Sequence, residues 1–460
     1  MPNNWRPVCK QSCLSKVLEK IMQNQITEYM HANILFPETQ HAYRRGRSCT
    51  TALLDVDTFV AKSKNEKKIP FLANTDQSGA FNVIDHRILI MKMKKLGFSE
   101  ESLKLILSYL KGRTNRTTVA GEISEELDVE NGVPEGSILG PLLYSIGQID
   151  VGVVTETTLT RIKDLHKVDD GCPSFPPMKV DGASLEYADD CSSLMAAKTI
   201  TELQVSLNIL MEEYLSYFSC NGLAINISKT NIICFSNDPE DRLTYDGQLD
   251  KKTCKLLGIN FDKSYNFNYH RVKITFGVLE KIKKLDKISR WMSRPMKKEM
   301  YTSFCLSVIY YNLDIYGRTD QVRKKLQVLM NKVLRKILDA SRYEKITNML
   351  KSLEMLSINN NYRYLQIMNM QKLLDKENSP FTFYCLDLEE RLVKTRNRFL
   401  RSTFSPKLES VKNSWLMRAM DWWNKLQLFK VKFAKSDEAK AEVKGKILTA
   451  WPNIDGDKID

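Results

Sequence analysis

Helical periodicity dominates the first 110 residues. Apolar side chains recur three or four positions apart, which is the spacing that buries one face of an α-helix. This spacing predicts helical segments over Gln11–Tyr29, 53–60, Ile88–Leu96 and Leu103–Leu110. In the first segment, the face expected to pack against the rest of the protein carries Leu14, Val17, Leu18, Ile21 and Ile26.

Shorter apolar runs bounded by polar residues predict strands. Ile69–Ala73 is such a run, and Asp76 stands at its exit. Two strand-like pieces within Ser184–Met195 meet around Ala188, Asp189 and Asp190. A hairpin is expected over Thr117–Leu127, and single strands over Leu223–Ile227, Ile232–Phe235 and Leu256–Phe261. Charged residues, a glycine and two adjacent prolines in 155–177 favour a surface insertion.

The second half of the chain is expected to be mainly helical. Residues 203–218 form an amphipathic pattern that stops at Asn221 and Gly222, and from Val272 the pattern stays helical for about a hundred residues. One apolar stripe there consists of Val322, Leu326, Leu329, Val333 and Ile337. The other sides of the same helix carry Arg323, Lys324, Lys325, Lys332, Arg335 and Lys336. We expect domain boundaries near Tyr269 and, less marked, near 377–380.

Composition excludes several classes of protein. The 460 residues are 43% apolar and 27% charged, as in globular proteins, and a domain size of roughly 150 residues predicts about three units. No apolar run reaches the ~18 residues of a membrane span, and Met1–Lys20 lacks the apolar centre of a secretory signal. The ten cysteines are scattered, so we expect reduced thiols, no structural zinc, and a location in the nucleus or cytoplasm.

Positive charge is concentrated in one segment. The net charge is +14, and residues 271–350 hold 19 Lys and Arg against 7 Asp and Glu. A basic face of this kind favours a partner with a phosphate backbone. A solvated helix surface is the ordinary alternative. An anionic membrane is less favoured, because the segment lacks the bulky apolar face of an interfacial helix.

Three acids lie where strands are expected to end: Asp76, Asp189 and Asp190. If the strand before Asp76 pairs beside the Asp189 hairpin, these carboxylates can share two Mg²⁺ ions, because hard cations prefer oxygen ligands. Two such ions activate a primer 3′-hydroxyl and steady a triphosphate. Taken alone, each acid has the ordinary interpretation of an exposed turn residue.

The motifs around these acids follow one another in a characteristic order. They are Asn4-Trp5-Arg6-Pro7-Val8, Gln40 with Tyr43-Arg44-Arg45-Gly46-Arg47-Ser48, Asp76-Gln77-Ser78-Gly79-Ala80-Phe81, Gly132-Val133-Pro134-Glu135-Gly136-Ser137, and Tyr187-Ala188-Asp189-Asp190. Over about residues 3–270 this order resembles the reverse transcriptase of non-long-terminal-repeat retrotransposons of the jockey and CR1 kind. By that resemblance, the chain is expected to be truncated before the first fingers strand.

The resemblance implies an α+β fold, the right-hand polymerase, with an antiparallel palm sheet and a helical C-terminal region. The expected limits are 1–68 for the truncated fingers, 69–270 for the palm with fingers elements, 271–376 for the basic helical thumb and 377–460 for the C-terminal helical region. The implied activity is RNA-directed DNA polymerisation with two Mg²⁺ ions. It would use an RNA template, a DNA primer and deoxynucleoside triphosphates, without a membrane.

The same resemblance assigns roles to residues. Asp76, Asp189 and Asp190 would be the catalytic, metal-binding acids. The nucleotide-binding residues would be Phe81, Arg6, Arg44, Gly136 and Lys229, with Phe81 excluding a 2′-hydroxyl from the incoming sugar. The residues that bind nucleic acid would be Arg47, Lys324, Lys325, Lys332, Arg335 and Lys336. Without the resemblance, Phe81 is a core side chain, Gly136 lies in a tight turn, and Lys229 and the arginines are solvated.

Several positions depart from the family pattern. Glu135 stands where the family usually has Gln, Asn82 where it has Asp, and Gln77 where it has Leu. A carboxylate at position 135 should repel phosphate. The alternative to an active polymerase is therefore a catalytically silent, truncated remnant that binds nucleic acid without polymerising. The tryptophans of the tail, 402–447, are assigned to packing rather than to base stacking.

Overall fold

The structure is a computed structural model that describes residues 9–44, 46–77, 81–165, 178–374, 388–392, 398–402, 415–426 and 437–450. The chain forms two compact units, each assembled from several segments. Unit 1 comprises residues 1–52, 71–232 and 242–250, and unit 2 comprises 53–70, 233–241 and 251–460. The limits given above for fingers, palm and thumb stay predictions.

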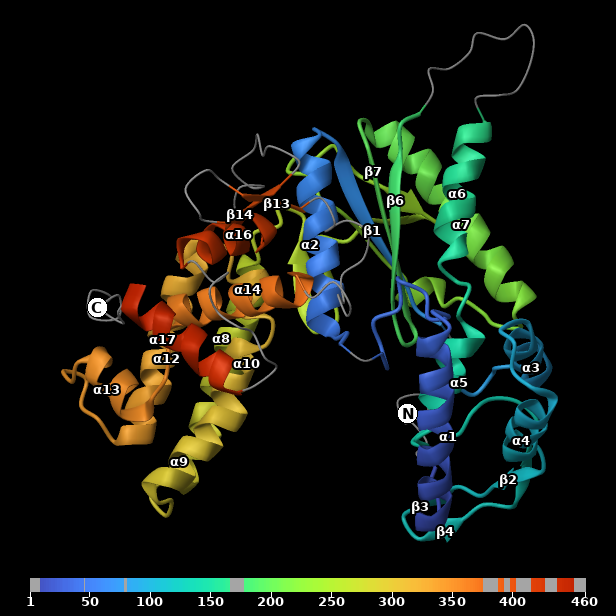
Figure 1. Ribbon diagram of the computed structural model, residues 1–460, viewed down its shortest axis with the longest axis horizontal. Helices are drawn as coiled ribbons and strands as arrows, with labels where there is room; N and C mark the ends of the chain where they lie inside the picture. The colour runs from blue at the N-terminus through green and yellow to red at the C-terminus, as the bar shows by residue number, and fades with distance from the viewer. Residues whose placement is uncertain are drawn as a thin grey trace, which may run out of the picture. The chain divides into compact units, whose positions relative to one another are not determined.

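The elements up to residue 250 are mixed helices and strands (Figure 1). The helices are α1 (Cys13–Ala32), α2 (Cys49–Asn65), α3 (His86–Lys95), α4 (Glu100–Leu110), α5 (Gly140–Gly147), α6 (Val153–Asp164), α7 (Ile200–Cys220) and the short η2 (Ile227–Lys229). The strands are β1 (Ile69–Thr75), β2 (Arg113–Asn115), β3 (Thr118–Val119), β4 (Glu122–Ile123), β5 (Leu127–Val129), β6 (Asp181–Tyr187), β7 (Asp190–Ala197), β8 (Asn231–Cys234), β9 (Thr244–Tyr245) and β10 (Gln248–Leu249).

The elements after residue 250 are mostly helices. They are α8 (Asn268–Ser289), α9 (Arg294–Tyr301), the π-helical turn η3 (Thr302–Leu306), α10 (Ser307–Tyr310), α11 (Leu313–Tyr316), α12 (Asp320–Leu338), α13 (Ile346–Leu353), α14 (Ile358–Leu374), α16 (Trp415–Lys425) and α17 (Asp437–Ala450). The strands are β11 (Thr253–Leu256), β12 (Ile259–Asp262), β13 (Leu388–Leu392) and β14 (Arg398–Ser402). The long helical stretch expected after Val272 is confirmed.

A four-stranded sheet positions the predicted acids. Its strand order is β6-β7-β1-β8. β6 and β7 form an antiparallel hairpin that begins with the pair Asp181–Ala196 and ends with Tyr187–Asp190. Every residue of β1 after Ile69 and every residue of β7 after Asp190 is buried, as expected for inner strands covered on both faces. The strands predicted before Asp76 and on either side of Asp189 are confirmed.

Two helices cover this sheet in unit 1. α6 packs against α7, and the two helices contact β6 and β7 respectively (Figure 1). The apolar side of α7 is buried, which confirms the amphipathic pattern over 203–218. The surface insertion predicted over 155–177 is wrong for its first part, because 155–164 belong to α6 and bury Thr155, Thr158 and Ile162. The prediction missed this helix because threonine, although it can pack against a sheet, is not counted as apolar when a helical pattern is sought. Residues 166–177 lie outside the described part.

The helix expected near the start of the chain is confirmed as α1, but its predicted buried face is wrong except at Ile26. Leu14, Val17, Leu18 and Ile21 are all more than half exposed, and the buried side consists of Glu19, Met22, Ile26 and Met30. The Glu19 carboxylate is 1% exposed and accepts hydrogen bonds from the backbone N–H groups of residues 138 and 139, at 2.6 and 3.3 Å. A buried acid that binds backbone donors ahead of α5 interrupts the apolar pattern.

Two other strand predictions differ from the structure. In 223–227 only Ile225 pairs, through an isolated bridge to Gln77. The strand expected over 256–261 is a hairpin of β11 and β12, whose turn is formed by Leu257 and Gly258, both with positive φ. The hairpin expected over 117–127 is confirmed by β3 and β4, with β2 pairing to β5 outside them.

In unit 2, helix α12 follows its predicted pattern with one exception. The stripe from Val322 to Ile337 is buried, as expected. Arg323, predicted for the polar side, is only 8% exposed, because its guanidinium bonds the side chain of Asn359 and lies 4.7 Å from the Tyr362 ring. No helix within the described ranges is long and apolar enough to cross a membrane. The eight cysteines of those ranges are free thiols.

Candidate active site

The sheet brings together the strand ends that carry the three acids. β1 and β7 are neighbouring strands. The Thr75 hydroxyl donates a 3.1 Å hydrogen bond to the Cys191 carbonyl. Thr75 directly precedes Asp76, and Cys191 directly follows Asp190. Asp76, Asp189 and Asp190 are all half-buried. Across the described residues, no group of three His, Cys, Asp or Glu side chains is assembled to hold a metal ion. The metal ligand set therefore stays a prediction.

The turn that contains Asp189 is strained, and a residue outside the hairpin hydrogen-bonds to it. Tyr187 pairs with Asp190, so Ala188 and Asp189 form a two-residue loop in which Ala188 has a φ of 57°. A residue with a Cβ is uncommon in this region, and such strain recurs at functional sites. The buried Gln40 side-chain oxygen accepts from the Ala188 and Ala42 backbone N–H groups, at 3.4 and 2.9 Å. Gln40 thus connects the loop after α1 to the acidic turn.

A fourth acid, Glu186, lies behind this turn and was not identified from the sequence. Its side chain is 2% exposed and accepts a 2.7 Å hydrogen bond from the Thr39 hydroxyl, while its other oxygen has no hydrogen-bond partner. Burial raises the pKa of Glu186 to about 7, with the charge of Asp150 adding to the effect. Glu186 is therefore largely protonated below neutral pH, so it does not add a full negative charge behind Asp189.

Lys229 lies beside the first acid, and the pyrophosphate contact that the resemblance implied for it stays a prediction. Its ammonium is 3.6 Å from the Asp76 carboxylate; the Lys229 side chain is 68% exposed and the half-buried Asp76 side chain is 39% exposed. The backbone fixes this proximity, because the N–H of Asn226 donates to the Asp76 carbonyl at 2.9 Å and Asn226 caps η2, which ends at Lys229. An exposed pair of this kind is weak and is easily exchanged for another anion.

The ring of Phe81 packs against a second aromatic ring. Its ring stacks on the ring of Tyr144 with centroids 4.6 Å apart and an interplanar angle of 25°. The Tyr144 hydroxyl is fully buried and donates to Gln77 at 2.7 Å. The Gln77 amide in turn donates to the thiol sulfur of Cys191 at 3.4 Å. Phe81 is thus connected to the residues that follow Asp76 and Asp190.

The turn around Pro134 docks on the segment that carries Phe81. Val133 N–H donates to the Phe81 carbonyl at 2.7 Å, and Gly132 N–H donates to the Ile84 carbonyl at 2.8 Å. A Cβ on Gly132 would lie 2.6 Å from the carbonyl oxygen of Asn82, so only glycine fits there. Gly136 has a φ of 93°, a conformation that side chains with a Cβ rarely adopt.

The two departures that suggested inactivity face each other in this turn. The Asn82 side-chain amide donates a 2.8 Å hydrogen bond to the Glu135 carboxylate. Where the family usually has Asp and Gln, this chain has Asn and Glu, so the amide and the carboxylate have exchanged places. The pair keeps one hydrogen bond and one negative charge. Each departure alone would change the charge of the pair, but the two together leave it unchanged.

The predicted fingers arginines have internal partners in the structure. Arg44 donates to the backbone carbonyls of Pro37 and Gln40, and burial lowers its pKa to about 10. The side chain of Arg47 is 3% exposed and is ion-paired with Glu38. These contacts hold the loop between α1 and α2 together, and the predicted phosphate contacts stay predictions. Arg6 lies outside the described residues.

In unit 2, the predicted basic face of α12 is accessible. Lys324, Lys325, Lys332 and Lys336 are exposed, and Arg335 is half-buried with a hydrogen bond to the Arg342 carbonyl. At 3.6 residues per turn, these five positions fall within about a third of the helix circumference, opposite the centre of the whole buried side of the helix. Lys336 also pairs with Asp286 at 2.8 Å. The face is basic apart from the exposed Val328, which lies among these positions, and its use in nucleic-acid binding stays a prediction.

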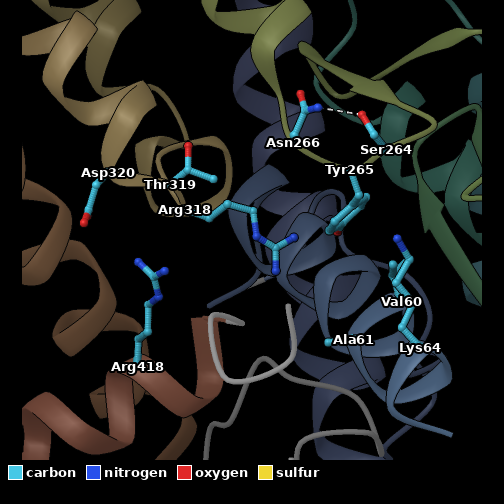
Figure 2. Close-up of a pocket in the computed structure, with 10 residues that line it drawn as sticks. All are labelled: Val60, Ala61, Lys64, Ser264, Tyr265, Asn266, Arg318, Thr319, Asp320 and Arg418. Atoms are coloured by element: carbon cyan, nitrogen blue, oxygen red, sulfur yellow. Dashed lines mark hydrogen bonds between the residues drawn. The ribbon is translucent and has the colours of Figure 1, made fainter. Parts of the chain in front are cut away.

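Unit 2 also contains a cavity of about 410 Å³ that the sequence did not indicate. Figure 2 shows the guanidinium of Arg318 beside the ring of Tyr265, with centroid and guanidinium carbon 4.8 Å apart. Behind it, Arg318 pairs with the buried Asp57 at 3.2 Å, and the Tyr265 hydroxyl donates to the same carboxylate at 3.0 Å. Burial lowers the pKa of Lys64, another lining residue, to about 8. These residues join α2 to the segment before α8.

Comparison with known proteins places this site in a family. A family model described as Reverse transcriptase (RNA-dependent DNA polymerase) matches residues 1–261, more than half of the chain. The chain is 26% identical over 374 residues to the "Probable RNA-directed DNA polymerase from transposon BS" of Drosophila melanogaster, covering 77% of this chain and 38% of that protein. It is 24% identical over 389 residues to the "RNA-directed DNA polymerase from mobile element jockey" of the same species, covering 82% and 40%.

The chain thus spans about two fifths of the length of these curated relatives. Among solved structures, it is similar to a telomerase from Candida albicans in complex with a fragment of telomeric RNA. The TM-score is 0.41 at 10% identity, over 75% of this chain and 59% of that one. The family match spans the motifs that contain Asp76, Phe81 and Asp189. The chain therefore belongs to the reverse transcriptase (RNA-dependent DNA polymerase) family.

Proposed function

We propose that the chain is an RNA-directed DNA polymerase that extends a primer 3′-hydroxyl by two-metal nucleotidyl transfer. The observation that carries this proposal is the position of Asp76 and of the Asp189–Asp190 turn on neighbouring strands, inside the segment that matches the family. Inner strands of a packed sheet hold their side chains in fixed positions. A transfer that needs an in-line geometry depends on such positioning.

Asp76 and Asp189 would hold the two Mg²⁺ ions, with Asp190 beside them. The donor chemistry fits, because all three are carboxylates, are half-buried rather than sealed in the core, and sit at the ends of the inner strands. Bound there, the ions would supply the positive charge that favours ionisation of the primer hydroxyl and stabilises the triphosphate. Lys229, already next to Asp76, would meet the pyrophosphate leaving group.

Phe81 would select deoxynucleotides by closing the space that a ribose 2′-hydroxyl needs. The support comes from Tyr144, whose buried ring stacks on Phe81 and restricts its movement. The turn formed by Pro134–Ser137 would carry the template base and the nucleotide, since the two residues before it, Gly132 and Val133, bond through their backbone to the Phe81 segment. The matched Asn82–Glu135 pair supports an active site rather than a decayed one.

The basic face of α12 would hold the template–primer duplex through its phosphates, without reading its sequence. Four exposed lysines on one side of a 19-residue helix form a surface suited to that contact. Arg44 and Arg47 would contact template or triphosphate only after giving up the internal bonds they make here. We therefore assign them a smaller share of the binding.

The test is primer extension by the purified chain on an RNA template with Mg²⁺ and deoxynucleotides. Extension by the wild type that is lost in Asp189→Asn, while template–primer affinity is kept, would support the proposal. Absence of extension with retained, salt-sensitive binding would overturn it in favour of the silent remnant. Undiminished extension by Asp189→Asn would reject the assignment of the acids. The matched control is Asp181→Asn, at the other end of the same hairpin.

A further inference from the structure

Gln77 is a polar side chain buried directly beneath the proposed active site. It is 6% exposed and lies one residue after Asp76. Its oxygen accepts from the Tyr144 hydroxyl at 2.7 Å, and its amide nitrogen donates to the Cys191 sulfur at 3.4 Å. Its backbone is also held, by an antiparallel bridge to Ile225. Gln77 therefore connects α5 to the start of β7.

The Tyr144 hydroxyl depends on this contact. Tyr144 is fully buried, and burial raises the pKa of its hydroxyl well above the ordinary value, with the charge of Asp189 adding to the effect. The hydroxyl is therefore neutral and must donate to a protein acceptor, because a buried polar group without a partner is costly. The acceptor is Gln77.

The ring of Tyr144 fixes the ring of Phe81. The two rings lie 4.6 Å apart and nearly parallel, and the backbone of Phe81 is held from the other direction by Val133. A shift of Tyr144 would leave Phe81 without its support. The position of Phe81 thus depends on Tyr144, and that of Tyr144 depends on Gln77.

We infer that Gln77 is a positioning residue that sets the sugar selectivity of this polymerase by fixing Tyr144 beneath Phe81. The inference rests on the proposed function, since it assumes that Phe81 contacts the incoming sugar. Gln77 does not touch the nucleotide itself. It acts on Phe81 through the ring of Tyr144. Its hydrogen bond to Cys191 also links the residue after Asp76 to the residue after Asp190, so the distance between these two acids depends on Gln77 as well.

The chemistry of the two partners makes them a matched pair. Leucine at position 77 would leave the Tyr144 hydroxyl without an acceptor, and phenylalanine at position 144 would leave the Gln77 oxygen without a donor. Replacing both partners by apolar groups of similar shape removes both unsatisfied groups together. The two single changes should therefore be harmful, and the double change should be less harmful than either.

The experiment compares Gln77→Leu, Tyr144→Phe and the double variant Gln77→Leu/Tyr144→Phe. The measured quantity is the ratio of kcat/KM for a deoxynucleotide to that for the matching ribonucleotide on one RNA template–primer. Unfolding by urea is followed for the same proteins. We expect Gln77→Leu to lower the selectivity ratio by about tenfold, because it removes roughly one buried hydrogen bond. The double variant should restore most of the lost selectivity.

The matched control is Tyr214→Phe, which removes another buried tyrosine hydroxyl of unit 1. Tyr214 is 2% exposed and shares a 2.8 Å hydrogen bond with Ser193, on the side of β7 where α6 and α7 pack. It should weaken the fold without changing the selectivity ratio. If Gln77→Leu behaves like this control, the role of Gln77 is only structural and the inference is wrong.

The outcomes separate the inference from the proposed function. If the wild type extends primers and Phe81→Val admits ribonucleotides while Gln77→Leu keeps full selectivity, the inference alone fails. If the wild type does not extend primers, the proposed function fails and the selectivity role falls with it. The unfolding data then still decide whether Gln77 and Tyr144 are coupled. Additive losses in the double variant would show that they are not, and would overturn the inference in either case.

Discussion

The Asn82 amide donates a hydrogen bond to the Glu135 carboxylate across 2.8 Å, joining the segment after Phe81 to the turn after Pro134. The two residues are 53 positions apart, and each is unusual for the family when considered alone. Together they form one amide–carboxylate pair with its two members exchanged. A negative charge at position 135 is therefore balanced by the loss of one at position 82, and the net charge of the pair is unchanged.

Asn82→Asp should raise KM for deoxynucleotides by about tenfold, because it places two carboxylates at hydrogen-bonding distance and adds a negative charge near the triphosphate. Steady-state primer extension measures this change. Adding Glu135→Gln to Asn82→Asp exchanges donor and acceptor again and should bring KM back close to the wild-type value. The neutral control Asn82→Ala loses the bond without adding charge. A double variant with a KM as high as that of Asn82→Asp would contradict the pairing.

Glu186→Gln should change how stability depends on pH. The pKa of Glu186 is raised to about 7 in the folded protein by burial, against about 4.5 when unfolded. The folded state therefore holds the proton more tightly, so this contribution to stability is complete below pH 4.5 and is lost as the pH rises through 7. Between pH 5 and 8 the free energy of unfolding of the wild type should fall by on the order of 3 kcal/mol relative to that of the glutamine variant.

Urea unfolding at several pH values measures this difference. Glu28→Gln on the exposed side of α1 is the control, because it removes a glutamate that is already in solvent. The free energy of unfolding of Glu186→Gln should exceed that of the wild type more at pH 8 than at pH 5. Parallel profiles for the two proteins would show that Glu186 does not hold its proton in the folded state.

The strands that carry the three acids could be predicted from the sequence, because local patterns determine them. An apolar run that ends at a polar residue marks β1, and a two-residue break between two such runs marks the Asp189 turn. The amphipathic pattern of α7 and the stripe of α12 were equally clear, since each buries one continuous face. These predictions needed no information about distant residues.

What the sequence could not reveal are pairs of residues far apart in the chain. Gln77 and Tyr144 look like unrelated polar and aromatic positions until the fold brings them to 2.7 Å. Glu19 illustrates the reverse case: a charged residue outside the predicted apolar face is buried because it binds backbone N–H groups of residues 138 and 139. Hydrophobic periodicity does not register a polar side chain whose partner lies a hundred residues away.

Asp57→Ala should destabilise unit 2 strongly. The carboxylate of Asp57 is buried, pairs with Arg318 at 3.2 Å and accepts from the Tyr265 hydroxyl at 3.0 Å. Removing it leaves a buried guanidinium without its countercharge, which typically costs about 3–5 kcal/mol. Urea unfolding measures the loss. The double variant Asp57→Leu/Arg318→Met removes both charges and should be clearly more stable than Asp57→Ala. If both variants lose the same free energy, the charge pair is not the cause.

Replacing Lys324, Lys325, Lys332 and Lys336 by alanine should weaken template–primer binding mainly at low salt. These lysines are exposed on one face of α12, and each that binds a phosphate releases a counterion. The slope of log affinity against log salt should therefore become shallower by roughly 0.7–0.9 for each phosphate that is no longer neutralised.

Fluorescence anisotropy over a salt series measures this slope, with Lys94→Ala/Lys95→Ala on α3 as the control for general loss of charge. A quadruple variant that binds more weakly with an unchanged slope would exclude phosphate binding by this face, because only released counterions make the affinity depend on salt.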